Sequence, residues 1–254
     1  MCNELQVTGL TAGYGKTPVL SGFSATCQAG CITALLGSNG AGKTTLLRAM
    51  VGCLRIQAGT IMLGDLDLVG LTPLERARRV ALVPQVSPDI LSLRVAEAVG
   101  LARYPQRNGR FTNGGSDNNA VKSALTAVEL EAYAGRRCSE LSGGEWRRVL
   151  VAQGLAQEPR VLLLDEPVTF LDPPARRRML HMLRELAGER QLIVLTVLHD
   201  LELAKEYAAQ ALLLRDGKLL AAGAPGDVLT CERLGELYEC DPRWVETQEG
   251  TPCG

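Results

Sequence analysis

The chain has 254 residues, of which 46% are hydrophobic, so it is long enough to bury the core of one large domain or two small ones. Its 27 Lys and Arg residues nearly balance its 28 Asp and Glu residues, and the net charge of −1 argues against a nucleic-acid-binding protein. The first residues carry no basic stretch followed by an apolar core, and no apolar run is long enough to span a bilayer, so neither a signal peptide nor a membrane helix is predicted.

The first 54 residues predict antiparallel strands followed by a strand, a glycine loop and a helix. Residues 1–30 alternate in polarity around glycine turns, which is typical of antiparallel strands. Residues 31–36, CITALL, are a short apolar run of the kind that forms a buried strand. The next nine residues, GSNGAGKTT, contain three glycines, and residues 46–54 then repeat apolar side chains at helical spacing.

The glycine loop is predicted to bind phosphate. Gly37, Gly42, Lys43 and Thr44 match the phosphate-loop pattern in the strand-to-helix context that the pattern requires. The glycines allow backbone N–H groups to surround an anion, and the positive end of the helix points to the same place. We expect Lys43 to reach the β- and γ-phosphates and the Thr44 hydroxyl to ligate Mg²⁺. Kinases, GTPases and motor ATPases share this loop, so it predicts a nucleotide without choosing among these classes.

The next segment predicts a hairpin, a short helix and a strand. Residues 59–69 have the pattern of a hairpin. Thr72 is expected to be the N-cap of a helix, with Pro73 in its first position and Glu75 completing a capping box. The chain then returns to a strand that is predicted to end at Gln85.

Residues 88–157 differ from the rest because most of them follow a helical period. A polar, glycine-rich stretch at residues 107–119 interrupts this pattern and predicts a surface loop. The segment is therefore expected to be a helical insertion.

The last third of the chain predicts a parallel sheet. Apolar runs at residues 161–165 and 191–198 flank a helical pattern at residues 173–188, and this β–α–β order implies parallel strands. Residues 211–223 read as two strands around an Asp-Gly turn. Residues 224–254 are weakly patterned and are expected to be a short tail.

Two acidic residues follow the apolar run that ends at residue 164. A strand that ends in Asp places a carboxylate at the edge where ligands bind in open α/β sheets. Asp165 is therefore predicted to hold Mg²⁺, directly or through water. Glu166 is predicted to polarise the attacking water as a general base.

Residues 141–145, LSGGE, begin a second helix that suits an anion. Ser142 is a good N-cap, Glu145 completes a capping box, and the two glycines free the backbone. An ordinary capped helix would have the same pattern, so the neighbouring motifs decide between the two interpretations.

Together these motifs resemble the ATP-binding cassette (ABC) family, the ATPase subunits of ABC transporters, over about residues 5–230. The glycine loop resembles the Walker A motif of that family, and residues 161–167, VLLLDEP, resemble its Walker B motif. LSGGE resembles its signature motif, which is the most specific of the set.

The resemblance implies roles for further residues. Gln85 resembles the glutamine of the Q-loop, and Leu171 with Asp172 resembles the D-loop. His199 resembles the switch histidine, and Tyr14 resembles the aromatic residue that stacks on adenine.

The chain also departs from the family pattern at two positions. The family usually has Gln two residues after the signature Glu, where this chain has Arg147, and it often has Thr or Ser in place of Val168. Neither position carries the chemistry that the family motifs imply.

The resemblance further implies a fold and a site. The fold is α/β, a P-loop NTPase (RecA-like) core with a parallel sheet, an N-terminal antiparallel β subdomain and an inserted helical subdomain that carries the signature. The expected division of this single domain is a core at 1–87 and 158–223, a helical subdomain at 88–157 and a tail at 224–254.

The expected cofactors are ATP and Mg²⁺. The residues expected to bind ATP are Gly37, Ser38, Asn39, Gly40, Ala41, Gly42, Lys43, Thr44, Thr45, Tyr14, Ser142, Gly143, Gly144 and Asp172; the catalytic residues are Glu166, His199 and Gln85; and the metal ligands are Thr44, Gln85 and Asp165.

The partners follow from the same resemblance. In that family two cassettes form a head-to-tail dimer, and each ATP lies between the Walker A motif of one subunit and the signature of the other. A second copy of the chain is therefore the first expected partner, and Ser142 and the N–H of Gly144 would touch the γ-phosphate that the other copy holds. Transmembrane permease subunits are the second, and an extracytoplasmic substrate-binding protein is an indirect one. No nucleic acid is expected, and the expected location is peripheral, on the cytoplasmic face of the membrane.

Three stretches, at residues 91–106, 165–172 and 197–204, are similar to the ATPases of importers for iron–siderophores, haem and cobalamin. Iron chelates are the first expectation for the substrate, then haem, then cobalamin. Residues 88–110 are expected to meet the cytoplasmic helices of the membrane subunits.

Two other classes stay open as alternatives: a soluble ABC protein of DNA repair or translation, and an ATPase that assembles iron–sulfur clusters. The sequence shows no second cassette, and its eight cysteines have no clustered metal-binding spacing. Several cysteines, among them Cys31 and Cys53, lie inside apolar runs and are expected to be small buried residues with reduced thiols.

Overall fold

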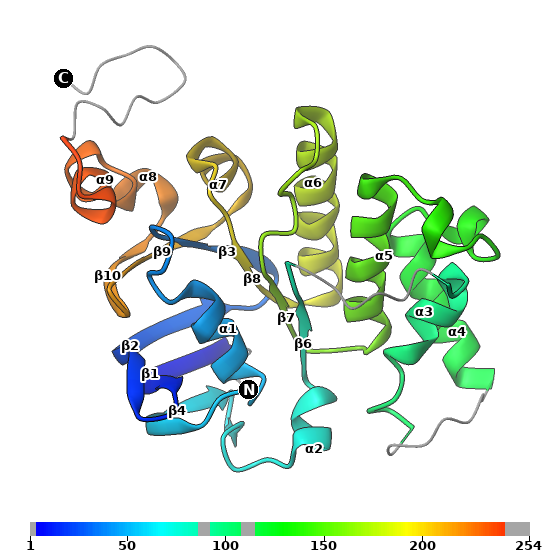
Figure 1. Ribbon diagram of the computed structural model, residues 1–254, viewed down its shortest axis with the longest axis horizontal. Helices are drawn as coiled ribbons and strands as arrows, with labels where there is room; N and C mark the ends of the chain where they lie inside the picture. Colours follow the sequence, from blue (N-terminus) through cyan, green and yellow to red (C-terminus); the bar gives the residue numbers. More distant parts are fainter. Residues whose placement is uncertain (1–3, 86–91, 108–114, 242–254) are drawn as a thin grey trace.

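The computed structural model describes residues 4–85, 92–107 and 115–241 and contains two sheets with helices between and around them (Figure 1). The larger sheet has six strands in the order β10-β9-β3-β8-β7-β6. Five of them are parallel, and β10 is antiparallel to β9. The bounds of these strands are β3 Cys31–Leu36, β6 Val80–Val83, β7 Val161–Leu164, β8 Ile193–Val197, β9 Gln210–Arg215 and β10 Lys218–Gly223.

The smaller sheet is antiparallel and has the strand order β2-β1-β4-β5. Its strands are β1 Glu4–Tyr14, β2 Thr17–Gln28, β4 Ile56–Leu63 and β5 Leu66–Asp67. Helix α1, Lys43–Met50, lies between the two sheets in Figure 1. One apolar cluster joins the three, because Leu46 and Leu47 of α1 pack with residues from both sheets, among them Leu5, Phe23, Leu35 and Leu195.

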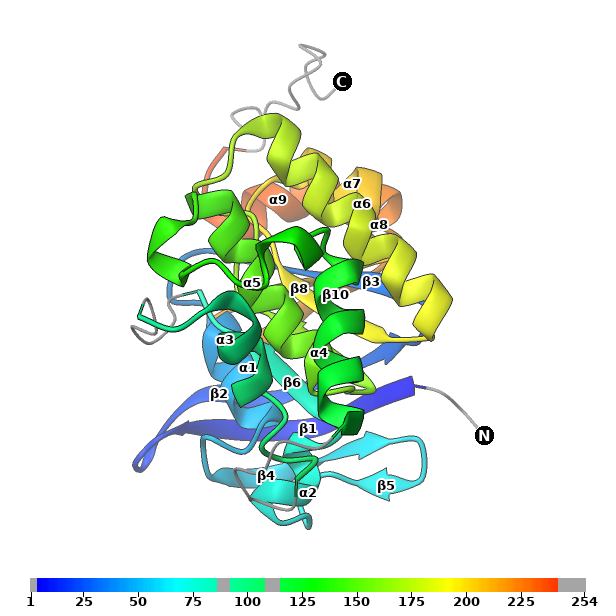
Figure 2. The same ribbon diagram turned by 90° about the vertical axis from the view of Figure 1, so that its right-hand side faces the viewer.

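The other face of the larger sheet packs against a second apolar cluster. This cluster includes residues of α6, Pro173–Arg190, and α7, Leu201–Tyr207, which follow β7 and β8. It also includes residues of α3, Val95–Leu101, α4, Gly115–Ala127, and α5, Gly143–Ala156. These last three helices lie together at one end of the molecule, away from the antiparallel sheet (Figures 1 and 2). The fold is therefore the expected α/β arrangement of a P-loop NTPase, with an antiparallel sheet at one side and a helical insertion at the other.

The division into core, helical subdomain and tail stays a prediction. The helical insertion and the parallel sheet share one continuous apolar cluster, so no break in packing separates them. Two short 3-10 helices, η1 Glu131–Tyr133 and η2 Cys138–Glu140, connect α4 to α5.

Several boundaries differ from the sequence prediction, each for a physical reason. The strand expected to reach Gln85 ends at Val83, because Pro84 has no N–H to donate to a strand partner. Helix α4 begins at Gly115, within the predicted loop, where the buried Asp117 accepts hydrogen bonds from Arg103 (3.0 Å) and Arg107 (2.7 Å). Tertiary contacts thus override the weak helix propensity of this stretch.

Residues 224–238 contain two helices that the sequence pattern did not reveal. Helix α8 spans Pro225–Val228 and helix α9 spans Cys231–Tyr238. Thr230 caps α9, and Leu234 and Leu237 are buried in the cluster under the parallel sheet. The predicted capping box at Thr72 is confirmed in the short helix α2, Pro73–Ala77. Among the described residues, the structure contains no helix with the length and apolar character that crossing a bilayer requires.

Candidate active site

The predicted phosphate loop connects β3 to α1 at the carboxyl edge of the parallel sheet. Gly42 is the N-cap of α1 with a φ of 106°, a conformation that residues with a side chain rarely adopt, and no side chain caps the helix. A Cβ at Gly37 would lie 2.3 Å from the carbonyl oxygen of Leu214 in β9, so the start of the loop has room only for glycine. The uncapped N–H groups at the start of α1 are therefore available to an anion.

Lys43 is a buried cation that points back into this loop. Its Nζ donates to the carbonyl oxygens of Gly37 (2.8 Å) and Ser38 (2.9 Å). Burial lowers the pKa of the Lys43 ammonium, and the charges of Glu166 and Asp165 act in the opposite direction. The ammonium is thus held beside the loop where a phosphate would lie. The other predicted loop residues lie around it: Asn39 and Gly40 are exposed, whereas Ala41 and Thr45 are buried.

Thr44 and Asp165 lie side by side although 121 positions separate them. The Thr44 hydroxyl donates to Oδ2 of Asp165 at 2.9 Å, directly after the end of β7. Burial raises the pKa of Asp165, and the hydrogen bond from Thr44 opposes this effect. Hydroxyl and carboxylate oxygens suit a hard cation such as Mg²⁺. In the part of the chain that the structure describes, no group of three His, Cys, Asp or Glu side chains is arranged to hold a metal ion, so a metal here would also need phosphate oxygens.

Glu166 is the centre of a small hydrogen-bond network. Its Oε1 lies 2.7 Å from Nε2 of His199, and its Oε2 accepts from Nε2 of Gln85 at 2.7 Å. The hydroxyl of Thr169 also donates to Oε2, at 3.0 Å. Burial alone would raise the pKa of Glu166, but the hydrogen bonds from His199 and Thr169 outweigh it, and the net pKa is below the ordinary value. Glu166 is therefore a carboxylate at neutral pH, able to accept a proton.

Tyr14 lies at the end of β1 with 49% of its surface exposed. Its hydroxyl accepts a hydrogen bond from Nη1 of Arg48 in α1 at 3.0 Å. This bond holds the tyrosine beside the helix that follows the phosphate loop.

The signature residues begin helix α5. The Ser142 hydroxyl accepts from the N–H of Glu145 (3.3 Å), and the Ser142 N–H donates to the Glu145 carboxylate (2.8 Å), so the predicted capping box is confirmed. A Cβ at Gly143 would meet open space, and one at Gly144 would contact Leu171 at 3.6 Å. The predicted D-loop therefore lies next to the signature.

Asp172 follows Leu171 and is the N-cap of α6, where its Oδ1 accepts from the N–H of Ala175 at 2.7 Å.

The predicted residues thus fall into two groups. Hydrogen bonds connect Thr44 to Asp165, and Gln85 and His199 to Glu166, and the two carboxylates are neighbours in the chain. Within the described ranges, no hydrogen bond or ion pair joins Ser142, Gly143, Gly144 or Asp172 to the phosphate loop.

Sequence reasoning missed two residues of this site. Thr169 lies three positions after Glu166, and a hydroxyl residue so close to a predicted base is a signal that could have found it. Arg48 is found only through its contact with Tyr14, because the two residues are 34 positions apart.

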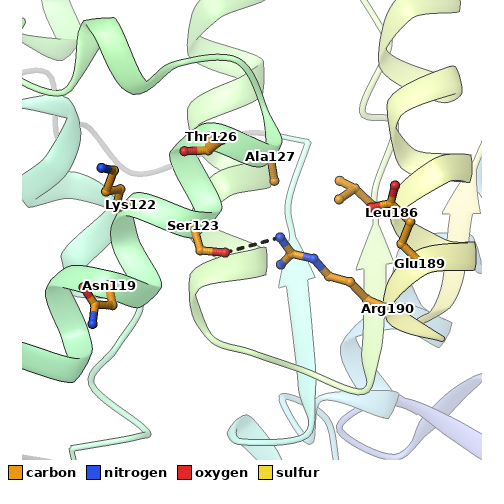
Figure 3. A pocket seen from close by; sticks show the side chains of 8 residues that line it. All are labelled: Asn119, Lys122, Ser123, Thr126, Ala127, Leu186, Glu189 and Arg190. Carbon is orange, nitrogen blue, oxygen red and sulfur yellow. Dashed lines mark hydrogen bonds between the residues drawn. The ribbon is translucent and has the colours of Figure 1, made fainter.

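A polar groove of about 400 Å³ lies apart from this site, between α4 and the end of α6 (Figure 3). Arg190 points across it and donates to the hydroxyl of Ser123 at 3.5 Å. Arg190 lies just before β8, whereas the candidate site follows the carboxyl end of that strand, so the groove is at the opposite edge of the sheet. The polar side chains that line it are exposed, and nothing in it fixes a ligand: Asn119, Lys122, Ser123, Thr126, Glu189 and Arg190.

Comparisons with known proteins agree with this geometry. A family model described as "ABC transporter" matches residues 20–169. The hemin import ATP-binding protein HmuV of Bordetella pertussis is 38% identical over 242 residues, which cover 92% of this chain and 91% of that protein. YusV of Bacillus subtilis, assigned to a siderophore transport system as its ATP-binding protein, is 35% identical over 229 residues, covering 90% and 83%. The cobalamin import ATP-binding protein BtuD of Halobacterium salinarum is 36% identical over 235 residues, covering 92% of this chain and 58% of BtuD.

Solved structures show the same fold. A structure described as the inward-facing conformation of an ABC transporter, assigned to the metal-chelate type, superposes with a TM-score of 0.81 at 27% identity, covering 94% of this chain and 90% of that one. The ADP conformation of the ATP-binding cassette MJ1267 superposes with a TM-score of 0.83 at 20% identity, covering 92% and 98%. The family match, the relatives and the phosphate-loop site agree, and the chain belongs to the ABC transporter family as one of its ATP-binding, ATP-hydrolysing members.

Proposed function

We propose that the chain is the ATPase subunit of an importer that carries a metal chelate through a separate membrane permease. The observation that carries the ATPase assignment is the convergence of Lys43, Thr44, Asp165 and Glu166 at one edge of the parallel sheet. The relatives named for import of hemin, siderophores and cobalamin support the transport role. An iron–siderophore chelate is the first candidate for the cargo, followed by haem and cobalamin.

The phosphate-loop side of the site is proposed to bind ATP. The N–H groups at the start of α1 and the Lys43 ammonium bind the β- and γ-phosphates, since both already face the same space. Thr44, Asp165 and Gln85 would hold Mg²⁺, which when bound neutralises charge on the phosphates. Tyr14 stacks on the adenine, and Arg48 holds it in place.

Glu166 is proposed to be the general base. Its carboxylate accepts a proton from the water that attacks the γ-phosphorus, while the bond between that phosphorus and the bridging oxygen breaks and ADP leaves. His199 and Gln85 orient the carboxylate, because each contacts a different oxygen of it.

The signature residues and Asp172 are proposed to serve the ATP of a second copy. This assignment explains why one chain has two helix starts suited to an anion. It is supported by the exposure of Ser142 and Gly143 and by the open space beyond Gly143. Phe170, next to this surface, is 91% exposed, which is unusual for an aromatic side chain unless a partner covers it.

We further propose that the permease docks in a groove of about 740 Å³ beside α3 and α4. Its lining includes the apolar residues Ala96, Leu101 and Val121 together with charged side chains, and Leu101 is 43% exposed. One side of the groove, from Ala96 to Arg107, belongs to the stretch at 88–110 that is predicted to meet the membrane subunits, and the other side comes from residues 118–134. Residues 88–91 and 108–110 of that stretch lie outside the described residues. The chain would then be peripheral, on the cytoplasmic face of the membrane. A binding protein on the other side would act only through the permease.

Charged residues at the start of α3 are poor test positions for this docking. The Glu97 carboxylate accepts from the Arg94 N–H at 2.8 Å, and the Arg94 guanidinium donates to the carbonyl of Gly135. Reversing either charge would disturb the start of α3. Leu101 avoids this problem, because its exposed side chain lines the groove.

The experiment that tests the function is transport in proteoliposomes that contain the permease and this chain with ATP on its side. We expect ATP-dependent uptake of one of three substrates, an iron–siderophore chelate, hemin or cobalamin, and no uptake with Lys43→Ala. The absence of ATP-dependent uptake for all three, with an active ATPase present, would contradict the proposed function.

A further inference from the structure

Arg147 is a buried arginine that connects the signature helix to the residue that holds the base. It lies in α5, five residues after the N-cap Ser142, and is 7% exposed. Its Nη1 donates to the carbonyl oxygens of Pro84 (3.2 Å) and Gln85 (2.8 Å). The side chain of Gln85 in turn donates to Glu166 at 2.7 Å. A continuous path of contacts therefore runs from α5 to the proposed general base.

The positive charge of Arg147 is offset by the carboxylates of the candidate active site and not by an acidic residue on its own helix. Among the described residues Arg147 forms no ion pair, and a buried cation without one is costly. Burial lowers the pKa of Arg147, and the charges of Glu166 and Asp165 oppose this effect. The negative charges of these two carboxylates therefore help to keep the buried guanidinium of Arg147 protonated.

The adjacent arginine shows the contrast. Arg148 is half-buried on the same helix, donates to the carbonyl of Val128 at 3.4 Å and pairs with Glu129 at 3.5 Å. Its contacts stay within the helical insertion. Proximity on α5 is therefore not enough to bring an arginine to the active site, since Arg147 contacts Gln85 and Arg148 does not.

The type of side chain at position 147 also bears on its role. The family usually has Gln here, which is shorter and donates from one uncharged amide nitrogen. The guanidinium of Arg147 reaches two consecutive carbonyls with a charged donor, and charged donors form the stronger hydrogen bonds. The link between α5 and Gln85 is therefore expected to be tighter in this chain than the usual residue would make it.

We propose that Arg147 is a positioning residue that couples the two nucleotide sites of the dimer. The inference rests on the proposed dimer, in which the start of α5 binds the ATP held by the second copy, while Gln85 and Glu166 act on the ATP held by this copy. When α5 takes its place over the partner's nucleotide, Arg147 fixes the backbone of Gln85, and Gln85 then orients Glu166. Hydrolysis at one site thereby depends on occupation of the other.

The first test compares Arg147→Met with Arg148→Met, which removes the adjacent arginine without touching Gln85. Arg147→Met should lower kcat for ATP by about ten- to one-hundredfold, because a displaced base loses much of its effect, with KM changed by less than about twofold. The Hill coefficient for ATP should fall toward 1. Arg147→Lys, which keeps the charge and one donor, should recover part of the rate. Arg148→Met should retain the kinetics of the wild type.

The second test is a double-mutant cycle with Gln85→Ala. If Arg147 acts through Gln85, then Arg147→Met should change kcat by less than about twofold once Gln85 is replaced. An equal loss in both backgrounds would overturn the inference, as would an equal loss in Arg148→Met. Melting temperatures show whether Arg147→Met is folded, and if it is not, Arg147→Gln takes its place in both tests.

Dimerisation of a Glu166→Gln variant distinguishes failure of this coupling from failure of the proposed dimer on which it rests. If a Glu166→Gln variant never dimerises with ATP and Mg²⁺, the dimer and the coupling both fail. If that variant dimerises but Arg147→Met hydrolyses ATP cooperatively at the wild-type rate, the coupling alone is overturned.

Discussion

The role of Tyr14 can be tested by removing its ring. Tyr14 is 49% exposed and lies outside the core, so Tyr14→Ala should leave the melting temperature nearly unchanged. Loss of one aromatic–base stack should weaken nucleotide binding by about 1–3 kcal/mol, which is about a 5- to 150-fold rise in Kd. Tyr14→Phe keeps the ring and loses only the exposed hydrogen bond from Arg48, so its Kd should rise by less than about threefold.

The assay is calorimetric titration with ADP and Mg²⁺, because ADP is not hydrolysed. Tripolyphosphate is the matched control, since it contains the phosphates without the adenine, and its affinity should be the same for all three proteins. An ADP affinity for Tyr14→Ala within about twofold of the wild type would refute the stacking role. An equal loss of tripolyphosphate affinity would show instead that the phosphate loop had been disturbed.

Three further predictions concern other parts of the molecule. Lys43→Ala should reduce steady-state ATP hydrolysis by at least about one-hundredfold, because a charge that stabilises the transferred phosphate is lost, and a rate near wild type would remove the phosphate-loop assignment. Leu101→Glu should abolish transport in proteoliposomes while the isolated subunit keeps its ATPase activity, whereas loss of both would indicate misfolding. Burial raises the pKa of the Cys27 thiol from 9.0 to about 12, so the free energy of unfolding should fall as pH rises through this range. At pH 8 an alkylating reagent should modify the exposed Cys53 in the native protein and leave Cys27 unmodified, and rapid labelling of Cys27 would contradict its burial.

The sequence was sufficient for those parts of the fold that depend on local chemistry. Thr72 and Ser142 begin helices because a hydroxyl and a glutamate three residues later satisfy the free N–H groups, and this pattern is visible in a few letters. The strand, glycine loop and helix around Lys43 were also predicted from a local pattern, namely an apolar run, closely spaced glycines and apolar residues at helical spacing. Helix α9 was missed although Thr230, Leu234 and Leu237 are a readable signal, because the rest of the tail is polar.

The parts of the site that could not be predicted depend on contacts between distant segments. Arg147 was noted only as a departure from the family pattern, and its place beside Gln85 follows from the packing of α5 against the end of β6. Arg48 and Tyr14 meet because the antiparallel sheet covers α1. Motif spacing names the residues that are proposed to handle the nucleotide, whereas tertiary packing determines which residues hold them in place.

The two anion-binding helix starts of one chain are proposed to serve different nucleotides. Sedimentation velocity of the Glu166→Gln variant, whose amide cannot accept a proton and which is therefore expected to retain ATP, is the sharpest test of this assignment. We expect a dimer with ATP and Mg²⁺ and a monomer without nucleotide, since binding that favours the dimer shifts the equilibrium by mass action. Adding Ser142→Arg should abolish the dimer while ATP still binds at Lys43, because the larger side chain occupies the place of the partner's γ-phosphate. Ser142→Ala loses the helix cap and the proposed hydroxyl contact with that phosphate but adds no bulk, so it should still dimerise, with a weaker dissociation constant. A Glu166→Gln protein that stays monomeric with ATP and Mg²⁺, or a dimer that survives Ser142→Arg, would show that the two helix starts do not share nucleotides in this way.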